Sequence, residues 1–445
     1  MNKKMFFVGD IVSPSSLEDL KYFTGFLQVE NGLITAIGTK CDFDKLLASG
    51  QYDDYEVHLL TSNQFLMPGF VDCHTHAPQY PNIGLGLDRP LLEWLDKYTF
   101  PLESQYSNKE FASYVYDKVV KRLLNNGTTS ACYYGTLHLD GTLALVDSIL
   151  KHHQRALVGK VSMNVKNDAG YFNDTSKELN EVETFVKTVY DFKNDLVEPI
   201  ITPRFAVSCD QVLMRKLSRI ANKYQCGIQS HISENLKEIE FVLEINSDCK
   251  SYSEVYEKCG IFDTKCIMAH AVYLGEVEMR TLSRKGVSVA HCPASNTRLK
   301  SGLCPVRKLL NNNIKVGLGT DVSGGDSSSI LDAIRRSMDV SQHLEMLGDS
   351  NTALNWKEAL YLATLGGAEA LHLNDKVGSF EVGKEFDSLL IDLYTEGSPI
   401  DHYTYSVAKK QEVLLEKVQR FIYLGDDRNI VKVYVKGNKV KDIST

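Results

Sequence analysis

Short apolar runs alternate with amphipathic stretches through the central part of the chain. A run of roughly four to eight apolar and β-branched residues between turn-forming residues is typical of a buried strand. Apolar residues that recur every three or four positions, as in NKEFASYVYDKVVKRLLNN and DQVLMRKLSRIANKY, are typical of an amphipathic helix. The pattern predicts eight strands, over residues 69–76, 128–135, 156–164, 198–205, 227–233, 266–273, 287–293 and 315–321.

The alternation of strand and helix favours a parallel sheet, because parallel neighbours can be joined only through a long crossover connection. Eight strand–helix units over roughly 250 residues fit a (β/α)₈ barrel of the TIM type. A doubly wound open sheet has the same alternation, so the count of elements leaves this alternative open. We therefore expect an α/β fold, with the barrel over residues 67–375.

Both ends of the chain have a different pattern, with short β-rich runs and turns in place of long helices. Near the N-terminus, the triplet ENG is a hairpin signal between two apolar runs. Near the C-terminus, the alternating segment RFIYLGDDRNIVKVYVKGNKVKDI has a turn signal at KGN. Residues 1–66 and 376–445 are therefore expected to form together a small β-sandwich domain beside the barrel.

Composition narrows the class of protein. The 445 residues are 43% hydrophobic, which is enough for a large buried core. The net charge is −8 and there is no dense block of Lys and Arg, so electrostatics disfavours nucleic acid and anionic membranes as main partners. Ten cysteines without a C-x-x-C pair indicate reduced, buried thiols. The N-terminal apolar run is too short for a secretory signal, and no apolar run is long enough for a membrane span, so we expect a cytoplasmic protein.

The candidate chemistry begins in GFVDCHTH, at the end of the first predicted barrel strand. Residues two apart in a strand point to the same face, so His74 and His76 can converge on one point. In a barrel, the carboxyl ends of the other strands meet at the same edge. GIQSHISE brings His231 there from the fifth strand, and KVGLGTD brings Asp321 from the eighth. Three imidazoles and a carboxylate together would suit one divalent metal.

Two further groups belong to the same edge, namely Glu234 one turn beyond His231 and His270 in CIMAHAVY of the sixth strand. Each of these residues has a structural alternative when it is taken alone. A single buried histidine is more often a hydrogen-bonded core residue, and Asp321 alone would be read as the N-cap of the next helix. The joint position at strand ends is what favours the functional interpretation.

The remaining histidines are weaker candidates for the metal site and the substrate pocket. His291, in VAHCPASN, ends the seventh strand near the site but adds nothing that the metal needs, so its contact with substrate stays an open alternative. The others lie in polar or helical contexts and are expected to be structural or solvent-facing: His58, His138, His152, His153, His343, His372 and His402.

At the level of motifs, the chain resembles the amidohydrolase superfamily in MPGFVDCHTH, SHISE, MAH, AHCPASN and GLGTDV. Within that superfamily, HAPQY, LLEWLDKYTFPLE, TPRFAVSC, QSHISEN, DAIRRSM, ATLGGAEAL and FIYLGDDRNI resemble the guanine deaminases. The resemblance runs from about residue 67 to the end, whereas the first 60 residues match only as a β-rich frame. One departure is Ser323 in DVSGG, where a smaller residue is expected at the pocket floor.

The resemblance implies a metal-dependent aminohydrolase that converts guanine to xanthine and ammonia. It implies one Zn²⁺ per chain, held by His74, His76, His231 and Asp321 with a position open for water, and hydroxide attack on C2 of the base. Asp321 would accept the proton of the water, Glu234 would carry a proton to a ring nitrogen, and His270 would orient the attacking water. It also suggests a homodimer.

The residues that the resemblance implies for guanine binding are Gln79, Arg204 and Phe205, together with the centre itself: His76, His231, Glu234 and Asp321. A planar guanidinium at Arg204 suits the carbonyl of guanine, and the amide of Gln79 can read a purine edge. The alternatives are an ion pair between Arg204 and a neighbouring carboxylate, and a solvent contact for Gln79.

The apolar and aromatic segment 91–103, which contains Trp94, is either a packed loop or a wall or lid over the base. Two other functions remain open at this stage. One is a related aminohydrolase that acts on another amino-substituted heterocycle. The other is a scaffold without catalysis, which the presence of every expected metal ligand disfavours.

Overall fold

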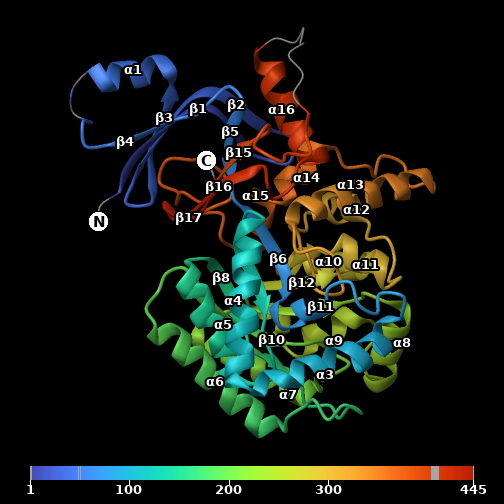
Figure 1. The fold of residues 1–445 in the computed structure, drawn as a ribbon. Coiled ribbons are helices and arrows are strands. Elements are labelled where there is room, and N and C mark those ends of the chain that lie inside the picture. The colour runs from blue at the N-terminus through green and yellow to red at the C-terminus, as the bar shows by residue number, and fades with distance from the viewer. Residues whose placement is uncertain (1–2, 49, 51, 402–409, 444–445) are drawn as a thin grey trace.

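The computed structural model describes residues 3–48, 50, 52–401 and 410–443. Two sheets organise these residues, a parallel barrel with surrounding helices and a second, largely antiparallel sheet (Figure 1). Figure 1 shows strands from the blue N-terminal end and the red C-terminal end side by side in this second sheet. The expected fold class, a TIM-like barrel with a small β domain from the two termini, is therefore confirmed.

The barrel strands follow one another in chain order, β6-β7-β8-β10-β11-β12-β13-β14, and each pairs in parallel with the next. The predicted strand 156–164 is divided into two short strands, both of which pair with β10. The bounds are β6 Phe70–His76, β7 Thr128–Tyr134, β8 Arg155–Gly159, β9 Val161–Ser162, β10 Val197–Pro203, β11 Gly227–Ile232, β12 Cys266–His270, β13 Ser288–His291 and β14 Val316–Leu318.

Hydrogen bonds close the barrel between β6 and the residues that follow β14. The carboxylate of Asp72 accepts hydrogen bonds from the Thr320 hydroxyl at 2.6 Å and the Thr320 backbone N–H at 3.1 Å. The backbone N–H of Asp321 donates to the His74 carbonyl at 2.9 Å. These contacts bring the end of the eighth strand against the end of the first.

Glycine at position 319 permits this approach. A Cβ atom there would lie 2.9 Å from the Cβ of His74 and 2.9 Å from the Sγ of Cys292, closer than real Cβ contacts come. The glycine therefore allows the backbone after β14 to run directly beside the backbone of His74.

Helices cover the outside of the barrel, and their sequences explain where they begin. In α4, Asn108 caps the N-terminus by accepting hydrogen bonds from two backbone N–H groups, and a stripe from Ala112 to Leu124 is buried. The barrel and its surroundings contain α2 Leu91–Trp94, α3 Phe100–Glu103, α4 Lys109–Asn125, α5 Leu139–His152, α6 Thr175–Asp191, α7 Gln211–Tyr224, α8 Leu236–Ile245, α9 Tyr252–Lys258, α10 Glu276–Lys285, α11 Pro293–Arg298, α12 Val306–Asn311, α13 Ile330–Met346, α14 Trp356–Leu362 and α15 Leu365–Ala370. Short turns are η1 Ala77–Asn82, η2 Leu95–Thr99, η3 Ser104–Ser107 and η4 Ile261–Asp263.

The second sheet has the strand order β17-β16-β15-β5-β1-β2-β3, with β4 paired to β1. Its members are β1 Lys4–Pro14, β2 Leu20–Glu30, β3 Leu33–Thr39, β4 Glu56–Leu59, β5 Gln64–Pro68, β15 Ser388–Asp392, β16 Ile430–Val435 and β17 Asn438–Asp442, and helices α1 Lys40–Ala48 and α16 Lys410–Leu424 accompany it. The small domain, expected as a sandwich, is thus one hydrogen-bonded sheet of eight strands in the described chain. Its central pairing, β5 with β15, joins the two ends of the sequence.

The domain limits 1–66, 67–375 and 376–445 stay a prediction. Among the histidines expected to be structural, His402 lies outside the described residues. Within the described ranges, no helix is long and apolar enough to cross a membrane.

Candidate metal centre and active site

Three histidines and one aspartate converge at the carboxyl edge of the barrel. His74 and His76 end β6, His231 lies near the end of β11, and Asp321 follows β14. The Oδ1 atom of Asp321 lies 3.2 Å from Nε2 of His74 and 3.4 Å from Nε2 of His76. The Nε2 atoms of His76 and His231 are 3.2 Å apart. Each of the four residues is at most 8% exposed, so the cluster is shielded from bulk water.

The orientation of these groups fits a metal ion. The Nδ1–H of His231 donates to the backbone carbonyl of Arg204 at 2.6 Å, which leaves Nε2 as the free acceptor toward the cluster. The buried Nε2 of His74 makes no hydrogen bond within the described residues, although Asp321 lies nearby. Nitrogen and oxygen acceptors that face one point without donors between them are the arrangement that a cation satisfies.

The protonation states agree with this arrangement. Burial lowers the pKa of His74, and it lowers the pKa values of His76 and His231 well below the usual range, so all three imidazoles are neutral. Burial would raise the pKa of Asp321, but the neighbouring histidines outweigh it and hold that pKa well below its usual range. Neutral imidazoles and an ionised carboxylate are the forms that bind metal.

Glu234 and His270 form a second pair beside this cluster. The Nε2 atom of His270 lies 3.4 Å from Oε2 of Glu234 and 3.9 Å from Oδ2 of Asp321. The Nδ1 atom of His270 contacts Oδ1 of Asn296 at 2.8 Å, and the Ser301 hydroxyl donates to Oε1 of Glu234 at 2.9 Å. One oxygen of the Glu234 carboxyl is thus held in place, while the other faces the histidine.

Burial raises the pKa of Glu234 to about 7, because the charged carboxylate loses its hydration. Burial also disfavours the charged form of His270, but the carboxylates of Glu234 and Asp321 outweigh it and raise that pKa. The pair therefore has the properties of an acid–base couple near neutral pH.

A pocket opens directly onto these groups. It encloses about 380 Å³ of empty space, counted out to its open mouth. Part of the lining is apolar and comes from the segment 91–103, which contributes Leu91, Trp94 and Leu95. The full lining is His76, Gln79, Leu91, Trp94, Leu95, Arg204, Phe205, His231, Glu234, His270, Leu299 and Asp321. Seven of the twelve lining residues are polar or titratable and five are apolar, so the pocket combines hydrogen-bonding groups with apolar contact surface, as small-molecule sites do.

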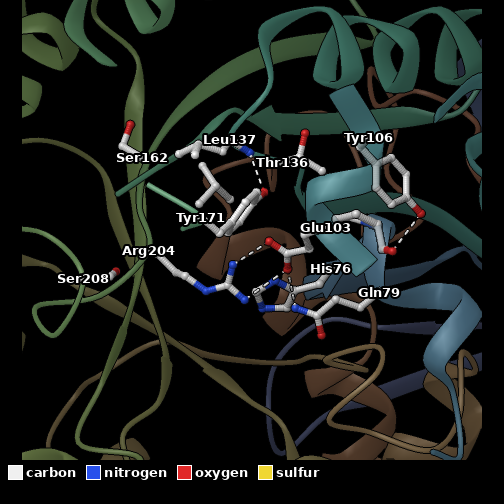
Figure 2. A network of polar contacts seen from close by, with 12 residues as sticks. His76, Gln79, Glu103, Tyr106, Thr136, Leu137, Ser162, Tyr171, Arg204 and Ser208 are labelled. Carbon is white, nitrogen blue, oxygen red and sulfur yellow. Dashed lines mark hydrogen bonds and ion pairs between the residues drawn. The ribbon is translucent and has the colours of Figure 1, made fainter. Parts of the chain in front are cut away.

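Two polar residues of the lining belong to a buried network that centres on Glu103 (Figure 2). Arg204, directly after β10, donates to Oε2 of Glu103 at 2.7 Å and to Oε1 at 3.1 Å. Gln79, in η1, donates from Nε2 to the same Oε1 at 2.9 Å. The Ser323 backbone N–H donates to Oε1 of Gln79 at 3.2 Å. Figure 2 shows Arg204 and Gln79 reaching Glu103 from different parts of the chain.

The sequence left alternatives open for Arg204, Gln79 and His291, and the structure gives the contacts of each. Arg204 has the ion pair that was one of its alternatives, and it also lines the pocket, so the two interpretations hold at once. Gln79 is 2% exposed, which excludes a solvent contact. His291 is fully buried, neither ring nitrogen has a hydrogen-bond partner in the described chain, and it does not line the pocket.

Sequence patterns missed Glu103, Asn296 and Ser301. A signal for Glu103 was present, since TFPLE ends an apolar and aromatic segment with a single carboxylate. Its partner Arg204 lies 101 positions further along the chain, so spacing alone gave no reason to connect them. Asn296 is the last residue of the motif AHCPASN, which was noted without a role for it, and Ser301 lies beyond the motif.

Comparisons with known proteins agree with the geometry of this site. Residues 65–440 match the amidohydrolase family. The chain is 45% identical over 418 residues to the guanine deaminase of Mus musculus, covering 94% of this chain and 91% of the relative. It is 35% identical over 379 residues to the guanine deaminase of Escherichia coli (strain K12), covering 85% and 83%. The crystal structure of the guanine deaminase from C. acetobutylicum, with guanine bound in the active site, superposes with a TM-score of 0.89 at 36% identity and covers 98% of this chain and 100% of that one.

Proposed function

Because this chain belongs to the amidohydrolase family, and within it to the guanine deaminases, we propose that it hydrolyses guanine to xanthine and ammonia. The observation that carries this function is the pocket itself, in which a buried cluster of three imidazoles and a carboxylate lies beside apolar and aromatic side chains. The lining also includes a guanidinium and an amide, which match the polar edge of a purine.

We propose Zn²⁺ as the metal, one ion per chain, with His74, His76, His231 and Asp321 as ligands. The support is chemical, because three neutral imidazoles and one carboxylate are a donor set that zinc accepts with a position left open. Iron and manganese accept a similar set, so metal analysis of the purified protein decides between them. When bound, such an ion acts as a Lewis acid that lowers the pKa of a water molecule to about 7.

The side chains of the pocket then move protons and hold the base. Asp321 accepts a proton from the attacking water as its oxygen bonds to C2 of guanine. Glu234 gives a proton to a ring nitrogen, so that the negative charge of the addition does not remain on the ring. The amino group then takes the proton held by Asp321 and leaves as ammonia when the C2–N bond breaks, and the hydroxyl on C2 gives its proton to Glu234 as the carbonyl of xanthine forms. His270, which contacts Glu234 and lies near Asp321, orients the water for this attack.

Recognition of guanine falls to other residues of the pocket. Arg204 donates to the 6-carbonyl group, since only two of its five N–H donors are used by Glu103. Gln79 reads the adjacent edge of the base, and Phe205 packs on it. Adenine has an amino donor where guanine has the carbonyl, so its binding would set a donor against Arg204. His76 and His231, besides Glu234 and Asp321, also contact the base in this pose.

Three further proposals concern the setting of the enzyme. A cytoplasmic location is supported by ten free cysteines, nine of which are buried and none of which is paired. A homodimer is supported by the family resemblance. The limits 1–66, 67–375 and 376–445 are proposed as the extents of the small β domain and the barrel.

A substrate comparison tests the function. Ammonia release and xanthine formation are measured on guanine, adenine, cytosine and an aminotriazine with metal-loaded protein, and guanine is expected to have the highest kcat/KM. Another heterocycle with a higher kcat/KM would replace guanine as the substrate. Removal of the metal with a chelator is expected to abolish activity, and addition of Zn²⁺ to restore it and to raise Tm.

A further inference from the structure

We infer that Glu103 is a positioning residue that sets base specificity, by holding the guanidinium of Arg204 and the amide of Gln79 in fixed orientations. This inference rests on the proposed function, because it concerns how the same pocket reads its substrate. Glu103 does not line the pocket and is 0% exposed, so it acts on the substrate through the side chains that it contacts.

The first part of the argument is the geometry at Arg204. Both terminal nitrogens of the Arg204 guanidinium donate to the Glu103 carboxylate, and this two-point contact fixes the orientation of the guanidinium plane. The ring of Phe100 covers one face of the guanidinium, with its centroid 5.2 Å from the Arg204 Cζ atom. A long side chain that is free to rotate would lose conformational entropy each time substrate binds, and these contacts remove that cost beforehand.

The second part is the geometry at Gln79. Its Nε2 atom donates to Glu103 and its Oε1 atom accepts from the Ser323 backbone N–H, so the amide cannot exchange its two ends. The second hydrogen of the amide and the second lone pair of its oxygen remain for a ligand. Because Oε1 of Glu103 accepts from both Gln79 and Arg204, one carboxylate sets the relative position of the two reading groups.

The third part concerns charge. The pocket is built for an uncharged base, yet it contains a guanidinium that is 2% exposed. Alone, such a buried cation would favour anionic ligands over neutral ones. A guanidinium stays protonated in proteins, so its charge has to be balanced inside the pocket wall. The Glu103 carboxylate, 2.7 Å from Nη1 of Arg204, balances that charge while leaving the guanidinium as a hydrogen-bond donor.

The test compares two ligands that differ in the group that Arg204 is proposed to read. Hypoxanthine has the 6-carbonyl group, together with the N1 proton that accompanies it, and purine has neither. Dissociation constants are measured by calorimetry on metal-loaded protein, so the result does not depend on turnover. In the wild-type chain, hypoxanthine is expected to bind ~10- to 100-fold more tightly than purine, as for a hydrogen bond to a charged donor.

In Glu103→Gln, the preference for hypoxanthine over purine is expected to fall by more than ~3-fold. The guanidinium of Arg204 loses its charged partner, and the N–H group of the new amide faces the N–H donors of Arg204 or Gln79. The kcat/KM for guanine is expected to fall ~10²-fold with the metal content unchanged, as for a small misplacement of a binding group. A ratio that stays within ~3-fold of the wild-type value, or rises, overturns the inference. If Glu103→Gln does not fold, the same measurement is made on Glu103→Asp, which keeps the charge but is one methylene shorter. The ratio is again expected to fall by more than ~3-fold, because the shorter carboxylate cannot reach both Arg204 and Gln79, and a smaller fall overturns the inference.

Glu178→Gln is the matched control. Glu178 is also 0% exposed and binds a buried cation, Lys160, at 3.0 Å, but neither residue lines the pocket. In Glu178→Gln, the ratio of the purine and hypoxanthine dissociation constants is expected to stay at the wild-type value. A comparable fall in this control would overturn the inference, because it would show that loss of any buried ion pair loosens the pocket. The proposed function fails separately, when the wild-type chain does not release ammonia from guanine.

Discussion

At the scale of single residues, Glu234 shows how one carboxyl can be held and still be reactive. Its Oε1 accepts a hydrogen bond from Ser301, while Oε2 faces His270 at 3.4 Å. Burial raises its pKa to about 7, so both protonation states are accessible at neutral pH. Neither of these two contacts of Glu234 is with a proposed metal ligand.

Glu234→Gln is expected to lower kcat by ~10²- to 10⁴-fold, because an amide of the same shape cannot relay a proton. Metal content and hypoxanthine binding are expected to stay close to wild type. These three quantities are measured by steady-state kinetics, elemental analysis and calorimetry on one preparation. Loss of the metal in this variant would show that Glu234 has a different role.

Arg204 carries two functions, and a substitution there separates them. Arg204→Ala removes the proposed partner of the guanine carbonyl, so KM is expected to rise. It also leaves the Glu103 carboxylate without its buried cation, so the free energy of unfolding is expected to fall by ~3–5 kcal/mol. Adding Glu103→Gln to Arg204→Ala is expected to restore part of the stability without restoring KM. Denaturant unfolding and steady-state kinetics measure the two effects, and a KM that recovered with stability would contradict the assignment of Arg204 to the substrate.

The residue scale also shows what a sequence can predict about a site. His74, His76, His231 and Asp321 could be found because strand ends in a barrel meet at one edge. The partner of Arg204 could not, because Glu103 comes from a loop whose path is set by tertiary packing rather than by periodicity.

At the scale of elements, the closure between β6 and the chain after β14 brings the first and last of the proposed metal ligands together. The expected strands are found at their predicted places because each is a short apolar run between turn signals. The division of the segment 156–164 into β8 and β9 was missed, because both parts are equally apolar and pair with the same neighbour, β10. A register shift in the pairing of β6 with β7, between Asp72 and Thr75, was also missed, because side-chain type does not reveal a bulge.

Gly319→Ala tests the closure. The added Cβ would lie 2.9 Å from the Cβ of His74, so β6 and the chain after β14 must separate and the ligand geometry must change. A lower zinc content per chain and a lower Tm are expected, measured by elemental analysis and calorimetry. Gly275→Ala is the control, since the nearest atom to its added Cβ is 3.6 Å away, and it is expected to retain the metal. Full metal content in Gly319→Ala would mean that the contact is relieved elsewhere.

At the scale of the whole molecule, a buried ion pair joins the barrel to the second sheet. Arg155, the first residue of β8, donates from Nε and Nη2 to the two oxygens of Asp387 at 3.1 Å, and from Nη2 to Glu385 at 2.6 Å. The Asp387 carboxylate also accepts from the Lys436 backbone N–H at 2.7 Å, next to the turn between β16 and β17. One acidic side chain thus links the amino end of a barrel strand to the last hairpin of the chain.

Arg155→Ala is expected to lower the free energy of unfolding by ~3–5 kcal/mol, because it leaves two carboxylates without a buried cation. The kcat for guanine at 25 °C is expected to stay at the wild-type value, since the pair lies at the opposite end of β8 from the pocket. Lys151→Ala removes an exposed pair with Asp117 and is expected to cost only ~0–1 kcal/mol. Equal stability of the two variants in denaturant unfolding would contradict a structural role for the link.

The pairing of β5 with β15 has a consequence for synthesis on the ribosome. The edge of β5 emerges before any of the barrel does, yet the strand that covers it is made only after the barrel is complete. A nascent chain that stops before Ser388 therefore exposes an open row of backbone donors and acceptors, which another chain can occupy. Truncated products are expected to be prone to self-association even when every ligand of the metal has already been translated.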